Sequence, residues 1–296
     1  MRYFYILSLI FSAAAFSQTT PLTQRNACAQ FSDTVVRIEA GDGVIMSQGT
    51  GFIVSEDGFI LTAYHVVRSR DGGFYPSIAV FLPNGQKENA TPVLPLSLEM
   101  GAQDFALLKI TVPDKLGYLD LGSFEEIRIG GDATIIGFPF SAISMSGTGI
   151  NQKFCLTASF AGTDIVTLTQ QGWITQSILN GTPKRIPVNK DIRVDVVYFQ
   201  GPSVKGISGS PIISRDTGHV VGIVTTKLTG ITEFLGRIKD QAAGHVGHTI
   251  TGNMDLPLVI NQTLTVLDEQ LANGLGSATG IDDPKEALRK AQRKKK

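Results

Sequence analysis

The sequence predicts an all-β protein, built as a barrel or a sandwich. Short apolar runs follow one another along much of the chain, and clusters of glycine, proline and asparagine separate them. Serial short strands with turn signals between them are typical of barrels and sandwiches, and they do not suit an alternating βαβ fold. Hydrophobic residues make up 42% of the chain and charged residues 18%, with 32 glycines. This composition indicates a globular, turn-rich protein.

The predicted strands fall into two groups. The first group comprises 34–39, 51–54, 59–63, 77–82, 93–98 and 105–110. The second comprises 133–137, 154–161, 165–169, 193–199, 211–214 and 220–225. A short helix over 22–29 precedes the first group, and Ser55-Glu56-Asp57-Gly58 is a good hairpin loop because Gly58 can adopt positive φ. Residues 170–192 are expected to form an extra loop or an extended hairpin, which either borders the active site or is an ordinary surface insertion.

One glycine-rich turn carries the strongest signal for chemistry. It reads Gly206-Ile207-Ser208-Gly209-Ser210-Pro211 and runs into an apolar strand. Glycine permits unusual backbone dihedrals and a close approach of substrate to the main chain. The turn therefore suits a nucleophilic Ser208, with the amides of Gly206 and Ser208 as an oxyanion hole. Taken alone, such a turn is as often only a turn.

Two further stretches supply the partners that a serine nucleophile needs. His65 closes the predicted strand 59–63, and Asp104 opens the strand 105–110. A serine hydroxyl requires a base to take its proton, and that base requires a group to orient it. The chain order of histidine, aspartate and serine is that of chymotrypsin-like enzymes. His219, His245 and His248 are weaker candidates for the base, and Asp114 and Asp120 are weaker candidates for the orienting carboxylate.

The three segments resemble a known family. TAYHVV (62–67), DFALLK (104–109) and GISGSP (206–211) are similar to the active-site blocks of the trypsin-like serine proteases, in particular the bacterial Deg/HtrA-type and glutamyl-endopeptidase-type branches. The stretches 49–54, 131–139 and 219–225 also match this family, so the resemblance covers residues 30 to 270 approximately. It implies two six-stranded antiparallel β-barrels with the active site between them, and a C-terminal helix.

The resemblance also implies a domain plan. We expect a trypsin-like protease domain over 18–274, with barrels over about 30–115 and 130–230 and a closing helix over about 255–272. An apolar stripe in 255–272 supports that helix. Residues 275–296 are expected to be a flexible basic tail, since 285–296 carry a net charge of +6, from seven basic residues minus one acidic residue. The tail is either a solvated terminus or a weak contact for an acidic surface.

The function implied is that of an exported serine endopeptidase that hydrolyses peptide bonds through an acyl-enzyme. The alternative is a catalytically silent trypsin-like module that binds peptides or partner proteins. Family pockets include residues equivalent to Pro202, Ser203, Thr225 and Lys227. Such a pocket fits small apolar side chains best, with an acidic side chain bound by Lys227 as second choice. By the same resemblance, the Thr225 hydroxyl is expected to donate to Asp104.

Processing and cofactors complete the expectations. Residues 1–17 have a basic start, an apolar run and small residues at a cleavage point, which predicts a signal peptide and a periplasmic or secreted protein. Cys28 and Cys155 could form a disulfide or be two small buried side chains, and the sequence leaves both open. No cofactor and no metal site is expected. The formal net charge of zero gives no reason to expect nucleic acid as a partner, and the oligomeric state is not predicted.

Overall fold

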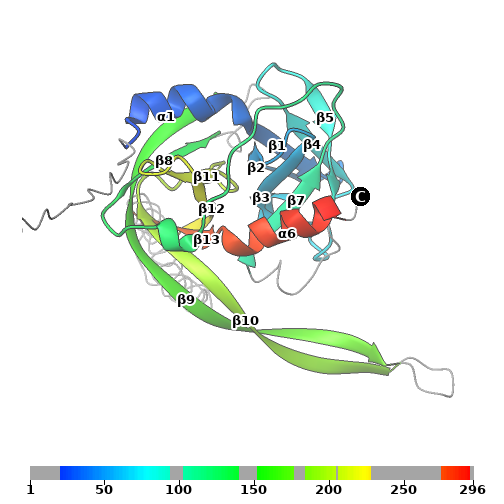
Figure 1. Ribbon diagram of the computed structural model, residues 1–296. Helices are drawn as coiled ribbons and strands as arrows, with labels where there is room; N and C mark the ends of the chain where they lie inside the picture. Colours follow the sequence, from blue (N-terminus) through cyan, green and yellow to red (C-terminus); the bar gives the residue numbers. More distant parts are fainter. Residues whose placement is uncertain are drawn as a thin grey trace, which may run out of the picture.

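The computed structural model describes residues 21–93, 103–139, 152–176, 184–204, 206–227 and 275–293. The predicted signal peptide, the predicted closing helix over 255–272 and both His245 and His248 lie outside these ranges. Two antiparallel β-sheets form the body of the described chain, with helix α1 above the second sheet and helix α6 beside the first (Figure 1). In the described ranges no helix is both long enough and apolar enough to cross a membrane.

The first sheet has seven strands in the order β5-β4-β1-β2-β3-β7-β6. The strands are β1 (Val35–Gly41), β2 (Met46–Ile53), β3 (Phe59–Ala63), β4 (Ser77–Phe81), β5 (Lys87–Asn89), β6 (Thr91–Pro92) and β7 (Phe105–Lys109). All five residues of β3 are buried, because β3 lies between β2 and β7. The turn that leads into β3 needs Gly58, whose φ is +91°. A Cβ there would lie 2.8 Å from the Ile110 carbonyl oxygen.

The second sheet is a closed six-stranded barrel in the order β10-β13-β12-β11-β8-β9. Its strands are β8 (Asp132–Gly137), β9 (Phe154–Gln176), β10 (Lys184–Gln200), β11 (Pro211–Ser214), β12 (Val220–Lys227) and β13 (Leu275–Gly280). The predicted all-β architecture with two barrel-like sheets is confirmed. Two details differ: the short edge strands β5 and β6 bring the first sheet to seven strands, and the second barrel extends past residue 230 because β13 closes it.

Strands β9 and β10 form one long hairpin that runs beyond the barrel (Figure 1). Their pairing is antiparallel from Gln176 opposite Lys184 to Ser159 opposite Gln200. The pairing of β9 with β10 shifts register between Tyr198 and Phe199. Such a bulge bends a strand and increases its twist. The interpretation of 170–192 as an extended hairpin is therefore confirmed. The predicted strands 154–161 and 165–169 are parts of the single strand β9.

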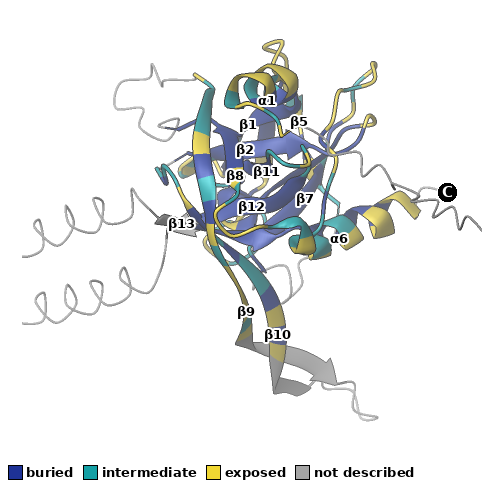
Figure 2. Cartoon of the chain, turned by 60° about the vertical axis from the view of Figure 1, so that its left-hand side comes forward, coloured by how far each residue is buried: buried dark blue, intermediate teal, exposed yellow. Residues whose placement is uncertain are grey.

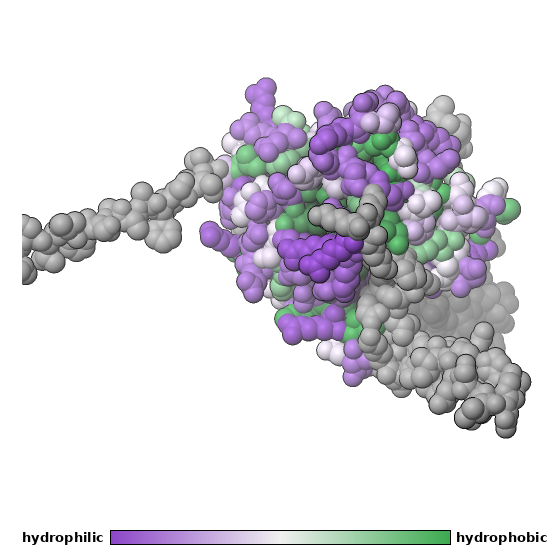
Figure 3. Space-filling model, turned by 45° about the vertical axis from the view of Figure 1, so that its right-hand side comes forward, coloured by the Kyte–Doolittle hydropathy of each residue, from purple (hydrophilic) through white to green (hydrophobic). Residues whose placement is uncertain are grey.

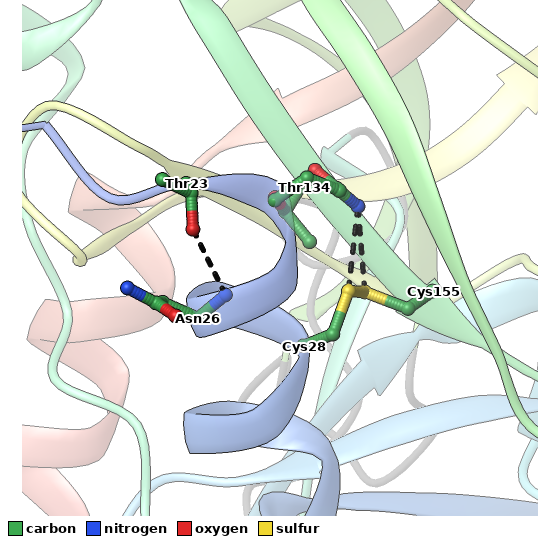
Figure 4. Close-up of a disulfide and its surroundings, with 6 residues drawn as sticks. Thr23, Asn26, Cys28, Thr134 and Cys155 are labelled. Carbon is green, nitrogen blue, oxygen red and sulfur yellow. Dashed lines mark hydrogen bonds between the residues drawn. A yellow bond between two sulfur atoms is a disulfide. The ribbon is translucent and has the colours of Figure 1, made fainter.

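Helix α1 (Gln24–Phe31) is fastened to the second barrel by a disulfide (Figure 4). The Thr23 hydroxyl caps the helix by accepting a hydrogen bond from the Asn26 amide at 3.2 Å. Cys28 of α1 is bonded to Cys155 of β9, with the two Cα atoms 5.8 Å apart. The question that the sequence left open is therefore answered in favour of a disulfide.

The C-terminal segment is ordered, which corrects the expectation of a flexible basic tail over 275–296. Residues 275–280 form β13, which pairs with both β10 and β12, so the glycines there lie within the barrel wall. Helix α6 (Asp282–Arg293) follows and buries Pro284, Ala287, Leu288 and Ala291. Most of its charged residues are exposed, and the side of the molecule that Figure 3 brings forward is predominantly hydrophilic. The segment resembled a tail because of its many basic residues. These residues occupy one face of α6, and the apolar residues on the opposite face pack against the core.

Both sheets contribute to one central core. The largest group of buried side chains joins Phe31 of α1, Phe52 of the first sheet, Ile136 of the barrel and Leu288 of α6. The barrel strands near this core are buried, whereas the hairpin grows more exposed as it leaves the body (Figure 2). The two sheets are therefore packed as a unit. Two short 3-10 turns, η1 (Ser32–Thr34) and η2 (Phe124–Glu126), lie in the connections.

Candidate active site

His65 lies in a single helical turn at the end of β3. This turn is α2 (Tyr64–Val67), and its Val66 and Val67 are buried while the His65 side chain is 41% exposed. Burial raises the pKa of the Tyr64 phenol, and the carboxylates of Asp71 and Asp104 act in the same direction while Arg68 opposes them. Apolar neighbours therefore anchor the turn and leave the imidazole at the surface.

Asp104 holds His65 through two hydrogen bonds. One carboxylate oxygen accepts the His65 backbone amide at 2.9 Å, and the other lies 2.6 Å from His65 Nδ1. This arrangement fixes the orientation of the ring and leaves Nε2 as the nitrogen that can exchange a proton with another group. The pairing of His65 with Asp104 agrees with the sequence analysis.

The backbone of Asp104 is in an unusual conformation. Its φ is +52°, and in the described part of the chain it is the single residue other than glycine with positive φ. Such a conformation costs about 1–3 kcal/mol and persists where surrounding contacts hold it. One of these contacts is the hydrogen bond from the Tyr64 amide to the Asp104 carbonyl, at 3.1 Å. The strain is therefore located at the residue that orients the histidine.

Ser208 sits on the connection between β10 and β11, in a turn shaped by two glycines. Gly206 has φ +99° and Gly209 has φ +86°. A Cβ at Gly209 would lie 2.0 Å from the Thr50 carbonyl oxygen and 2.4 Å from Thr62 Oγ1. Because no side chain fits in that space, glycine lets the serine turn pack directly on β2 and β3.

Thr50 of β2 is the main link between the first sheet and the serine turn. Its amide donates to the Ser208 carbonyl at 2.8 Å, and its hydroxyl donates to the Gly206 carbonyl at 2.8 Å. The same hydroxyl accepts the Phe138 amide at 3.0 Å. The sequence analysis included residue 50 in a matched segment but gave it no role, because a small hydroxyl side chain in a strand has no distinctive signal.

The serine turn and the histidine turn approach each other across Gly49. A Cβ at Gly49 would lie 2.6 Å from Val66 Cγ2 and 3.0 Å from the Ser208 carbonyl oxygen. The hydrogen bonds within the described residues do not include one between the Ser208 hydroxyl and His65. The structure therefore places the serine turn beside the histidine turn and forms the hydrogen bonds between His65 and Asp104.

The two amides predicted as an oxyanion hole have no acceptor among the described residues. The amides of Ile207 and Ser210 are used within the turn, donating to the carbonyls of Val204 and Ile207. The Gly206 and Ser208 amides donate to none of the described groups. The Ile207 side chain is 1% exposed and packs in the barrel core.

The predicted pocket residues lie on both sides of this turn. Ser203 is buried, Pro202 is half-buried and Thr225 is 7% exposed, while the side chain of Lys227 lies outside the described part. Thr225 occupies a register shift between β12 and β13. Within the described residues its hydroxyl makes no hydrogen bond to Asp104, so that predicted contact is not formed.

Two of the competing candidates contact other groups. His219 Nδ1 lies 3.0 Å from Glu126 Oε2, next to η2. The backbone carbonyl of Asp120 accepts the Val220 amide at 2.9 Å. Across the described ranges no group of three His, Cys, Asp or Glu side chains is placed to hold a metal ion.

Comparison with known proteins places the chain in a family. The model of the trypsin-like peptidase domain matches residues 49–223. Serine protease HTRA1A of Danio rerio is 30% identical over 216 residues, which cover 69% of this chain and 37% of the relative. Serine protease HTRA4 of Homo sapiens is 30% identical over 207 residues, covering 69% of this chain and 36% of the relative.

A bacterial relative and a solved structure also match the chain. A probable periplasmic serine endoprotease, DegP-like, of Halomonas elongata is 27% identical over 248 residues, covering 82% of this chain and 42% of the relative. The chain thus spans less than half the length of these relatives. The solved structure described as "HtrA-type protease AlgWS227A with tripeptide" has 22% identity and a TM-score of 0.48, covering 69% of this chain and 54% of that one.

Proposed function

The chain belongs to the trypsin-like peptidase family, and from this premise we propose that it is a serine endopeptidase acting through His65, Asp104 and Ser208. The observation that carries the proposal is the pair of hydrogen bonds that the Asp104 carboxylate accepts from His65, beside a serine turn that packs on β2 and β3. A base oriented by a carboxylate next to a serine is the arrangement that activates a hydroxyl for acyl transfer.

The reaction follows from these positions. Ser208 Oγ attacks the carbonyl carbon of a peptide bond while His65 Nε2 accepts the hydroxyl proton, and the Asp104 carboxylate stabilises the resulting imidazolium. The amides of Gly206 and Ser208 donate to the oxyanion of the tetrahedral intermediate. His65 then gives its proton to the leaving amine, and water repeats the attack on the acyl-enzyme to release the second product.

A second function is supported by one observation. Within the described residues the Ser208 hydroxyl and His65 are not hydrogen-bonded, which is what a silent module that binds peptides without cleaving them would present. The enzyme is preferred because hydrogen bonds between catalytic groups are often long in structures without substrate and tighten when substrate binds.

A mass measurement distinguishes the two functions. Purified protein and its Ser208→Ala variant are treated with a fluorophosphonate probe, and their masses are measured by intact-protein mass spectrometry. We expect one adduct on the parent and none on Ser208→Ala. Absence of an adduct on both would favour the silent module and overturn the proposal.

The substrate class is part of the proposal. Ser203, Thr225 and the half-buried Pro202 beside the serine turn provide no charged side chain for a basic substrate, so we propose cleavage after small apolar residues. Cleavage after an acidic residue, whose side chain Lys227 would bind, is the second choice. A peptide library that varies the residue before the cleaved bond tests this, and preferred cleavage after lysine or arginine would contradict it.

The cellular location is proposed to be periplasmic or extracellular. The Cys28–Cys155 disulfide supports it, because disulfides persist in oxidising compartments and are rare in the cytosol. The predicted signal peptide over 1–17 points the same way. Sequencing the N-terminus of protein recovered from the periplasm or the medium tests both, and intact residues 1–17 on cytosolic protein would contradict them.

A further inference from the structure

The residue before Asp104 is bound by the C-terminal segment of the chain. Gln103 is 5% exposed. The Gln103 backbone carbonyl accepts a hydrogen bond from the Thr279 hydroxyl of β13. The Gln103 side-chain amide donates to a carboxylate oxygen of Asp283 in α6. The same amide lies 3.5 Å from the Arg193 carbonyl of β10. Both the main chain and the side chain of Gln103 are thus bound by β13, α6 and β10.

These contacts fall on the peptide that carries the strained conformation. The Gln103 carbonyl belongs to the peptide group that joins it to Asp104, whose φ is +52°. On the other side, the Asp104 carbonyl accepts the Tyr64 amide. A residue in a sparsely populated conformation persists where surrounding contacts fix it. The hydrogen bonds to Gln103 and the hydrogen bond from the Tyr64 amide therefore together set the orientation of Asp104.

Helix α6 is itself fixed in position, so Asp283 is a well-placed acceptor for the Gln103 amide. It contacts β7, the strand that Asp104 precedes (Figure 1). Its first residues are tied down twice, by the Phe124 amide donating to Asp282 at 3.2 Å and by Lys285 Nζ donating to the Gly122 carbonyl at 2.8 Å. The buried face of α6 packs in the same core as Phe105 and Leu107 of β7.

The Asp283 carboxylate also depends on Gln103. Burial raises the pKa of Asp283, and the neighbouring carboxylates of Asp195, Glu286 and Asp282 act in the same direction, while the hydrogen bond from Gln103 opposes them. Arg193 Nε lies 3.9 Å from Oδ1 of Asp195, one of these neighbouring carboxylates. The Gln103 amide therefore partly compensates for a crowded group of acids, which gives the contact a reason beyond packing.

We propose that β13 and α6 position the catalytic aspartate, with Thr279 and Asp283 acting through Gln103 as positioning residues for the His65–Asp104 pair. This inference rests on the proposed function for its effect on turnover. It assigns to the C-terminal segment a part in building the active site, through hydrogen bonds to Gln103, the residue that precedes Asp104.

Substitutions in this link should change turnover more than substrate binding. Asp283→Ala removes the acceptor for Gln103, and Thr279→Val removes the donor to the Gln103 carbonyl with little change of shape. Because a small displacement of a catalytic group is costly, we expect each to lower kcat by about 10- to 100-fold with KM little changed. Asp283→Asn keeps an oxygen that can accept the Gln103 amide, and it should restore the activity of the parent.

A spectroscopic readout tests the same link without relying on catalysis. The proton between His65 Nδ1 and Asp104 should give a low-field resonance in the spectrum of 15N-histidine-labelled protein, since the two atoms are 2.6 Å apart. We expect Asp283→Ala and Thr279→Val to shift or broaden this resonance. Glu286→Ala is the matched control, because Glu286 lies one turn along the same helix and pairs with Lys290 at 2.8 Å.

The outcomes separate the two hypotheses. An unchanged resonance and unchanged kcat in both Asp283→Ala and Thr279→Val, with folding verified by thermal denaturation, would overturn the positioning role. An effect of Glu286→Ala equal to that of Asp283→Ala would overturn it too, since the cause would then be general loosening of α6. Failure of the parent to react with the fluorophosphonate probe would overturn the endopeptidase function, and the resonance would still test the position of Asp104.

Discussion

The first sheet and the second barrel differ in the separation of their strands along the chain. The first sheet takes all its strands from residues 35–109, mostly through local hairpins. The barrel takes five strands from residues 132–227 and closes with β13 at 275–280. The first unit is therefore assembled from contacts close in sequence, whereas the second depends on a segment near the chain's end.

The two units also hold each other's part of the candidate site. Thr50 of the first sheet binds the carbonyls of Gly206 and Ser208 in the serine turn. Thr279 of the barrel strand β13 and Asp283 of α6, the helix that follows β13, bind Gln103, next to Asp104. Neither unit therefore contains the complete candidate site, because hydrogen bonds from outside each unit position its loop.

The largest effect is expected from breaking the histidine pair within the first unit. Asp104→Asn should lower kcat by about 10,000-fold, because an amide favours the wrong tautomer of His65 while leaving the shape of the site unchanged. Steady-state hydrolysis of a peptide substrate measures this. Asp120→Asn, at an exposed position that the sequence offered as a rival, is the control and should match the parent. Equal loss in both variants would contradict the assignment of Asp104.

The next effect concerns the second unit alone. Replacing Cys28 and Cys155 together by serine should lower the free energy of unfolding by about 2–5 kcal/mol, because the bond closes a loop across 127 residues of sequence separation. Denaturant titration measures it. Labelling of Ser208 under native conditions should stay close to that of the parent, since the disulfide joins α1 to β9 and none of its contacts involves the proposed triad. Unchanged stability would show that α1 is held by packing alone.

Thr50→Val breaks the hold of the first unit on the serine turn. Valine keeps the shape and leaves the buried Gly206 carbonyl and Phe138 amide without their partner, which should cost about 1–3 kcal/mol of stability. The rate of fluorophosphonate labelling should fall in parallel, because the oxyanion amides lose their support. Thr157→Val, at an exposed position in β9, is the matched control. A labelling rate equal to that of the parent would argue against a role for Thr50.

The smallest effect tests the acids between β10 and α6. Burial raises the pKa of Asp195 above its ordinary value of 3.8, with Asp282 adding to the rise and Arg193 opposing it. The ionised carboxylate is thus disfavoured in the folded state, and this penalty is absent below pH 3.8 and grows as the pH rises through the raised pKa. Asp195→Asn should therefore raise Tm by about 2 °C at pH 7.

The pH dependence provides the check on that prediction. The gain in Tm of Asp195→Asn should disappear as the pH is lowered toward 3.8, because both proteins then carry a neutral group at this position. Thermal denaturation followed by circular dichroism at a series of pH values measures it. A gain that does not change with pH would point to packing instead of charge.

The sequence alone determined the fold class and three residues of the candidate site. Alternating apolar runs and turn signals predicted the strands, because a strand's burial pattern is local. His65, Asp104 and Ser208 stood out because each is a reactive side chain in a distinctive local setting, at a strand end or between glycines.

The tertiary structure decided the elements whose role depends on distant partners. The segment 275–293 resembled a flexible basic tail, and it became β13 and α6 because β10, β12 and the core offered pairing and an apolar surface. The Cys28–Cys155 bond required its two sulfurs to meet across the fold. Thr50, Gln103 and Asp283 are ordinary polar residues in sequence. Their importance comes from the hydrogen bonds that they make between the two units, and no local pattern records those contacts.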